Sequence, residues 1–149
     1  MSTTTTLPTV PVVPWAEYSD VDVDGLTFVA FRSFPLSEEE GCGAVDVQQV
    51  WHLTADGAWV PDPDGARLVL DDLPSVTSVE QAHQLATALS LAVELFEEVH
   101  ASDALAADEA LAARWQALSG TATVDDLHDL ATALGTPVAA LLRLREATR

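Results

Sequence analysis

The sequence predicts an α+β fold, in which a small antiparallel β-meander is covered by a long helix and followed by a helical C-terminal subdomain. Hydrophobic residues alternate with polar ones over much of residues 26–70, and their spacing changes to the helical period after Pro74. Of the 149 residues, 48% are hydrophobic. A chain of this length buries about 68–70% of its unfolded surface, so we expect a core that needs no disulfide or metal.

The first fourteen residues predict a flexible arm. A threonine tract is followed by Pro8, Pro11 and Pro14, and each proline disfavours helix at the preceding residue. The N-terminus has no basic region and no continuous apolar run, so it does not resemble a secretory signal, and we expect a cytoplasmic protein. An acidic α+β domain is then predicted over residues 15–100.

The clearest predicted strand spans residues 26–34. Leu26, Phe28, Ala30 and Phe34 share one face of it, and aromatic and β-branched residues are enriched. An acidic loop, residues 35–43, follows.

Further strands are predicted after this loop. Val45, Val47, Trp51 and Leu53 lie on one face of a second strand, and Asp56-Gly57 is a hairpin signal. Short strands at residues 58–60 and 66–70 complete the meander, separated by a turn at residues 61–65.

A long helix is predicted over residues 78–100, with Thr77 or Ser78 as its N-cap. It would cover the hydrophobic face of the meander. Its predicted inward stripe consists of Ala82, Leu85, Ala86, Leu89, Val93, Phe96 and Val99.

Three shorter helices are predicted in a C-terminal subdomain, residues 101–149. Ser102 would cap the first, which would bury Trp115 and end at Gly120. The second would be capped at Thr123 and end at Gly135, and the third would begin at Thr136-Pro137.

The charge is strongly acidic and unevenly distributed. The chain has 24 acidic residues, six arginines and no lysine, a usage that resembles proteins of high-GC bacteria, and its formal net charge is −18. Most of the excess lies before residue 111, so direct nucleic-acid binding through residues 1–100 is not expected. Anionic membranes are disfavoured for the same reason, and no apolar run is long enough to span a bilayer.

One motif suggests a calcium site. Asp20, Asp22 and Asp24 precede Gly25 in a pattern that matches the first half of a calcium loop. The twelfth position of such a loop would be Phe31 rather than a bidentate glutamate. The alternative is an acidic turn, and we assign no metal ligand.

No catalytic or cofactor-binding residue is assigned. The chain has no phosphate-binding glycine loop and no nucleophile elbow, and its only cysteine, Cys42, lies beside three glutamates that would raise its pKa. The four histidines lack metal-ligand spacing, and His52 and His83 are expected on solvated faces. Asp62-Pro63-Asp64-Gly65 predicts an ordinary turn, and Trp59 is the tryptophan best placed to contact a partner.

The segment 124–143 resembles the last two helices of lambda-repressor-like (Cro-type) helix-turn-helix regulators. The matching positions are Leu127, Leu130, Ala131, Leu134, Gly135, Leu141 and Leu142. In that family these helices pack behind the recognition helix and often contribute to dimerisation. Residues 101–120 contain one basic residue, Arg114, so the resemblance implies a repurposed module that pairs with itself or with a true repressor.

These observations predict a non-enzymatic, acidic regulatory protein that binds another protein, for which a basic nucleic-acid-binding protein is a candidate. Homodimerisation through residues 124–145 is a further expectation. The alternatives are a helix-turn-helix-like transcriptional regulator using residues 101–145 and a calcium-binding protein using the Asp20–Gly25 loop.

Overall fold

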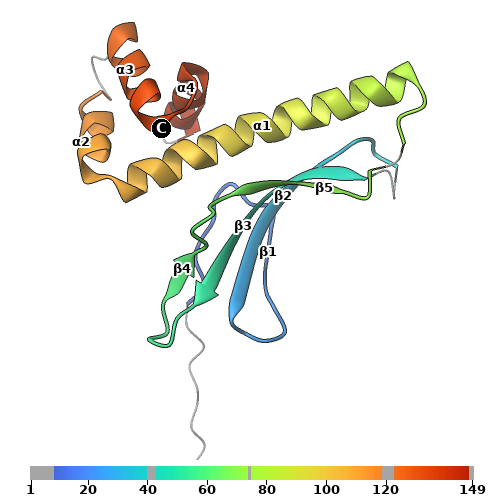
Figure 1. Ribbon diagram of the computed structural model, residues 1–149, viewed down its shortest axis with the longest axis horizontal. Helices are drawn as coiled ribbons and strands as arrows, with labels where there is room; N and C mark the ends of the chain where they lie inside the picture. The colour runs from blue at the N-terminus through green and yellow to red at the C-terminus, as the bar shows by residue number, and fades with distance from the viewer. Residues whose placement is uncertain (1–8, 40–42, 74, 119–122, 148–149) are drawn as a thin grey trace, which may run out of the picture.

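The computed structural model describes residues 9–39, 43–73, 75–118 and 123–147, and over these ranges it confirms the α+β fold. A five-stranded antiparallel sheet lies on one side of a long helix, α1, and three shorter helices lie on its other side (Figure 1). The strands are β1 (Tyr18–Val21), β2 (Thr27–Pro35), β3 (Ala44–Leu53), β4 (Trp59–Pro61) and β5 (Arg67–Asp71).

The sheet is built around β3. On one edge β3 pairs with β2, which pairs in turn with β1. On its other edge β3 pairs with β5 along its first half and with β4 at its end. The predicted strands and the hairpin at Asp56-Gly57 are confirmed, and Gly57 has the positive φ of 81° that the turn requires.

Strand β1 was not predicted from the sequence. All four of its residues are exposed, so no burial marks it in the pattern of hydrophobic residues. Backbone pairing with β2 holds the strand, and the ring of Tyr18 stacks on that of Phe31 with centroids 5.4 Å apart. Trp51 and Trp59 are half-buried beside Phe28 at the far end of the sheet, with ring centroids 5.4 and 6.0 Å from that of Phe28.

Helix α1 spans Val79–Ala107 and is longer than predicted. Its Ser78 cap is confirmed, because the hydroxyl accepts a hydrogen bond from the Gln81 amide at 3.1 Å. The predicted end at residue 100 and the predicted N-cap at Ser102 are wrong. Alanine and leucine are frequent after residue 100 and favour helix, so the break comes at Asp108, whose carboxylate caps α2 (Glu109–Ala117).

Helices α3 (Val124–Leu134) and α4 (Val138–Ala147) confirm the two predicted C-terminal helices. Thr123 and Asp126 form a capping box, and Gly135 ends α3 in the left-handed conformation with a φ of 67°. Leu130, Leu134 and Leu141 are buried against the C-terminal half of α1, and Trp115 packs at the edge of this cluster as predicted. Gly120 lies outside the described residues.

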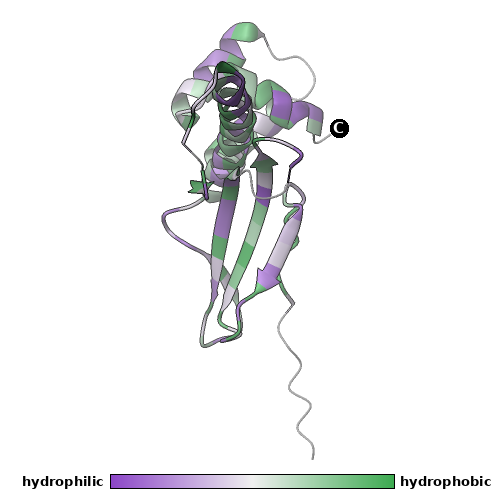
Figure 2. Cartoon of the chain, turned by 90° about the vertical axis from the view of Figure 1, so that its right-hand side faces the viewer, coloured by the Kyte–Doolittle hydropathy of each residue, from purple (hydrophilic) through white to green (hydrophobic). Residues whose placement is uncertain are grey.

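The inward stripe predicted for α1 is partly wrong. Ala82, Ala86 and Leu89 are exposed, whereas Ala88 and Ala92 are buried against Val45 and Val47 of the sheet. The physical reason is size, because two alanines one turn apart let the helix approach the sheet closely. α1 therefore lies between the sheet and the C-terminal helices, as its nearly end-on view in Figure 2 shows. An apolar face of its N-terminal half is left uncovered by described residues.

Candidate protein-interaction surface

The uncovered face of α1 forms a continuous apolar strip. Its members follow one another at intervals of three and four residues, so they lie on the same side of the helix. Val79 is 75% exposed and Leu89 is 39% exposed. We call the set the α1 strip, and it consists of Val79, Ala82, Ala86, Leu89 and the half-buried Val93.

A groove continues this strip towards α4. It has a volume of about 550 Å³ and is open to solvent. Pro137 and Arg143 form its α4 side. Its α1 side consists of Ala86, Leu89, Ser90, Val93, Glu94 and Glu97.

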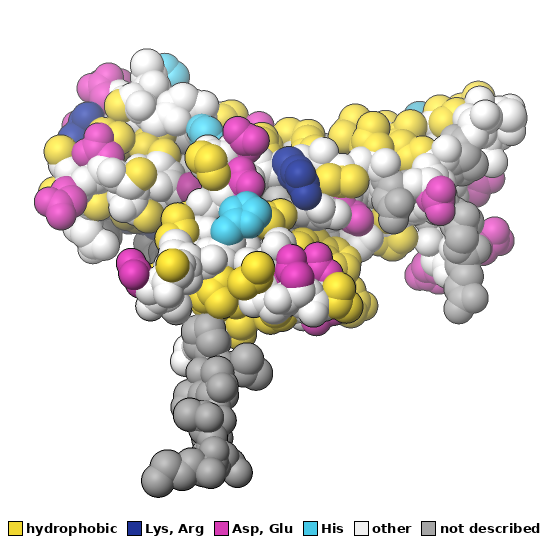
Figure 3. Space-filling model, turned by 60° about the horizontal axis from the view of Figure 1, so that its bottom comes forward, with side chains coloured by type: hydrophobic (Ala, Val, Ile, Leu, Met, Phe, Trp, Pro, Cys, Tyr) yellow, Lys and Arg dark blue, Asp and Glu magenta, His cyan; other side chains and the backbone are white. Residues whose placement is uncertain are grey.

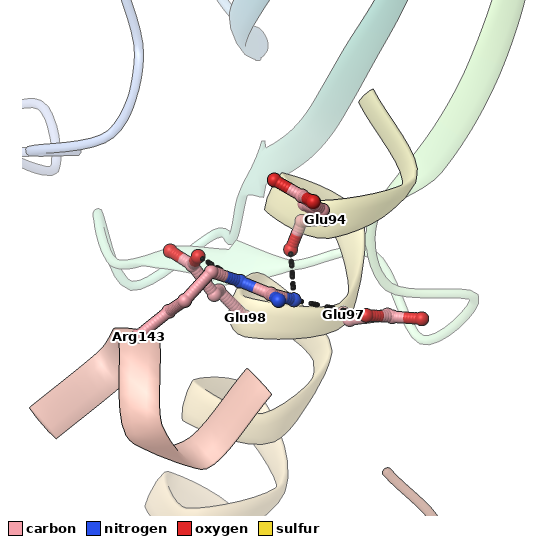
Figure 4. Close-up of polar contacts among 4 residues, drawn as sticks. All are labelled: Glu94, Glu97, Glu98 and Arg143. Atoms are coloured by element: carbon pink, nitrogen blue, oxygen red, sulfur yellow. Dashed lines mark hydrogen bonds and ion pairs between the residues drawn. The ribbon is translucent and has the colours of Figure 1, made fainter. Parts of the chain in front are cut away.

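Arg143 lines one end of the groove and is held there by hydrogen bonds to glutamates of α1. Its Nε donates a hydrogen bond to Glu98 Oε1 at 2.8 Å, and its Nη2 donates to Glu97 Oε2 at 3.0 Å and to the Glu94 carbonyl oxygen at 3.4 Å (Figure 4). The Arg143 and Glu97 side chains are 29% and 28% exposed, so both ion pairs are partly shielded from solvent. One guanidinium thus binds two carboxylates and joins α4 to α1.

The three glutamates lie together because they are at positions i, i+3 and i+4 of one helix. Arg143 supplies one positive charge to them, so this end of the groove keeps two negative charges. Glu94 is exposed, and its carboxylate makes no ion pair within the described parts of the chain. The site can therefore accept further cationic groups.

The surroundings of the groove are acidic as well. From residue 68 to residue 113 the sequence has nine acidic residues and neither lysine nor arginine. The opposite face of the molecule, seen from the side of the sheet in Figure 3, also carries several acidic side chains and few basic ones. The apolar strip is therefore set in a negative field.

The sequence does not predict the position of this site. Arg143 follows Glu98 by 45 residues, and its position near the end of a helix is explained equally well by the helix dipole. The members of the α1 strip other than Val79 belong to the stripe that periodicity predicts to face inward. The exposure of the strip depends on which face of α1 packs against the sheet, and hydrophobic spacing alone does not determine that face.

The carboxylates of the Asp20–Gly25 segment are mostly used by their own turn. Asp22 Oδ1 accepts a hydrogen bond from the Val23 amide, and Asp24 Oδ1 accepts one from the Leu26 amide, both at 2.8 Å. Asp20 lies exposed on β1. Among the residues that the structure describes, no three or more His, Cys, Asp or Glu side chains are placed to hold a metal ion.

The turn at residues 62–65 is confirmed, with a φ of 72° at Gly65. Asp62 accepts a hydrogen bond from the Asp64 amide at 2.9 Å, and its other carboxylate oxygen lies 2.9 Å from His52 Nε2. The contact with His52, supported by the Asp64 amide, lowers the pKa of Asp62.

The remaining candidate residues are accounted for by packing or exposure. His52 and His83 are exposed as predicted, and Cys42 lies outside the described residues. The Trp59 ring packs beside Phe28, and its buried indole N–H has no acceptor among the described atoms, so this side chain belongs to the sheet.

Two polar contacts at the sheet were not predicted. The Ser33 hydroxyl donates to Asp46 Oδ1 at 2.5 Å, and Asp46 is buried. The buried Gln49 donates from Nε2 to Asp103 Oδ2 at 2.9 Å, which ties the sheet to α1. Partial burial raises the pKa of Asp103, although the hydrogen bond from Gln49 and the nearby His100 act in the opposite direction.

The described helices include none that is long and apolar enough to cross a membrane. Comparison with protein-family models, with curated proteins and with solved structures finds no match to this chain.

Proposed function

We propose that this chain is a non-enzymatic regulatory protein that acts by binding another protein of net positive charge. The observation that carries the proposal is the α1 strip, an apolar surface that is set among carboxylates of which only some are neutralised. Apolar surface supplies affinity when it is buried, and complementary charge raises the rate of encounter.

In this mechanism the two parts of the surface act in sequence. The negative field attracts a basic partner over a distance of about 8 Å at physiological ionic strength. Contact with Ala86, Leu89 and the adjoining groove then excludes water and holds the complex. High salt should accordingly slow association more than it speeds dissociation.

The test is recovery of the tagged full-length chain from lysate of its own host, with and without nuclease. The variant Ala86→Glu/Leu89→Glu places charge on the α1 strip, and Leu70→Glu is the matched control on β5, where the leucine is 59% exposed. We expect a stoichiometric basic protein to survive nuclease treatment and the control substitution but to be lost from the strip variant. Recovery of the chain alone, or of nuclease-sensitive DNA instead of protein, would contradict the proposal.

A further inference from the structure

The α1 strip also indicates the form of its occupant, and this inference rests on the proposed function. We infer that the partner presents a cationic amphipathic helix, which lies along α1 between Val79 and Val93. Four observations support it: the packing of α4, the length and side-chain sizes of the uncovered half of α1, the chemistry of the α1 backbone and the distribution of charge.

Helix α4 provides the internal precedent. It lies against the C-terminal half of α1 (Figure 1) and buries Leu141 there beside Ala101 and Leu105. Its Arg143 binds Glu97 and Glu98. An amphipathic helix with an arginine is thus the kind of ligand that this side of α1 already binds. Within the described residues, α3 and α4 cover only the C-terminal half of α1.

The length of the uncovered half of α1 and the sizes of its side chains are suited to packing against a second helix. Residues 79–93 span about 22 Å, which is about four helical turns. Ala82, Ala86 and Ser90 are small and allow another helix to approach closely, while Val79 and Leu89 stand out as ridges.

The backbone of α1 argues against an extended peptide. Strand addition requires free N–H and C=O groups along an edge, and those of α1 are used within the helix. A partner can therefore contact this face only through side chains, and aliphatic residues at helical spacing would match the strip.

Charge selects a cationic helix and disfavours a second copy of this chain. Glu94 lies at one end of the strip and Glu97 lies just beyond it, and both line the groove. A second copy would bring the same carboxylates against them and would add a chain of net charge −18. Arginine or lysine on the flanks of an incoming helix would instead pair with these glutamates.

The probe is a synthetic peptide of about 18 residues, with leucine and alanine on one helical face and arginine on the other. Its controls are a scrambled isomer of the same composition and a counterpart with glutamate in place of arginine. Binding of labelled peptide to the full-length chain is measured by fluorescence anisotropy at physiological salt.

We expect the amphipathic cationic peptide to bind the wild-type chain and the Leu70→Glu control equally, and to bind Ala86→Glu/Leu89→Glu about tenfold more weakly or worse. Glu94→Gln should weaken binding and reduce its dependence on salt. Circular dichroism of each variant checks that it is folded, which we expect because the substituted side chains are exposed.

Equal binding of the scrambled isomer would show attraction by charge alone and would overturn the inference, as would an unchanged affinity of the strip variant. A dimer that forms through the strip in sedimentation would also overturn it. If the peptide fails while a basic protein is still recovered through the strip, the helical occupant is wrong and the proposed function stands. If both fail, the proposed function falls as well.

Discussion

At the scale of single residues, two polar contacts stabilise the interior around β3. Asp46 is 6% exposed and Gln49 is 4% exposed, and each has a side-chain partner. A buried polar group that loses its partner costs more than an ordinary hydrogen bond contributes.

Ser33→Ala removes the donor to Asp46. We expect the free energy of unfolding to fall by about 1–3 kcal/mol, because the carboxylate stays buried with one donor fewer. Urea titration followed by circular dichroism measures it. Ser33→Thr retains the hydroxyl and suits a strand, so a similar loss in that variant would point to packing and not to the hydrogen bond.

Asp103 makes stability depend on pH in the direction opposite to most carboxylates. Its pKa is raised above 3.8 in the folded protein, so the folded state binds the proton more tightly than the unfolded state. The contribution to stability is therefore largest below 3.8 and is lost as the pH rises through the raised pKa.

Asp103→Asn can still accept the hydrogen bond from Gln49 and does not ionise. We expect its stability at pH 7 to equal or exceed that of wild type, and its advantage to shrink on acidification. Thermal melts from pH 3.5 to pH 7 test this. A variant that is less stable than wild type at pH 7 would show that the charge of Asp103 is needed.

At the scale of elements, the packing of α1 determines which of its apolar faces is exposed as the α1 strip. Two substitutions distinguish its buried face from the α1 strip. Ala92 is completely buried, so Ala92→Leu should lower the free energy of unfolding by about 1–3 kcal/mol through overpacking. Ala86→Leu adds the same atoms to an exposed position and should change stability by no more than about 0.5 kcal/mol.

Alanine and leucine have similar helix propensities, so propensity contributes little to either value. Denaturant titration of both variants compares them directly. If Ala86→Leu were the more destabilising of the two, the stripe expected from the sequence would be the buried one after all.

Hydrophobic periodicity predicted where the helices and strands lie better than it predicted which of their faces pack against other elements. Val45, Val47, Phe28 and Ala30 alternate along β2 and β3, and all four are buried as that alternation implies. Helix α1 is apolar over more than one face, so spacing alone could not choose between Leu89 and Ala88.

The choice between those faces depends on long-range packing, and so does the ion pair of Arg143. Strand β1 escaped prediction for a related reason, because backbone pairing rather than burial holds it. The sequence therefore predicted the acidic and apolar character of the candidate surface, but not its position.

At the scale of the whole molecule, repulsion between like charges opposes folding. With a net charge of −18, compaction brings many carboxylates close together. Raising the ionic strength from about 0.01 M to about 0.15 M shortens the screening distance from about 30 Å to about 8 Å.

We therefore expect Tm to rise with sodium chloride over this range. A gain of about 1 kcal/mol corresponds to about 2–4 °C for a chain of this size. Sucrose at equal osmolarity controls for effects other than screening. A fall in Tm would mean that ion pairs such as those of Arg143 outweigh the repulsion.

Because α1 contributes residues to both hydrophobic cores, it couples their unfolding. α1 supplies Ala92 to the sheet core and Ala101 and Leu105 to the helical core within a single 29-residue ladder of hydrogen bonds. Melting of the C-terminal helices would expose the final turns of α1, and fraying there would propagate towards the sheet. Calorimetry should accordingly record one transition, with equal calorimetric and van't Hoff enthalpies. A ligand that rigidifies the first turns of α1 would then slow hydrogen exchange in α3, which contributes no residue to the groove.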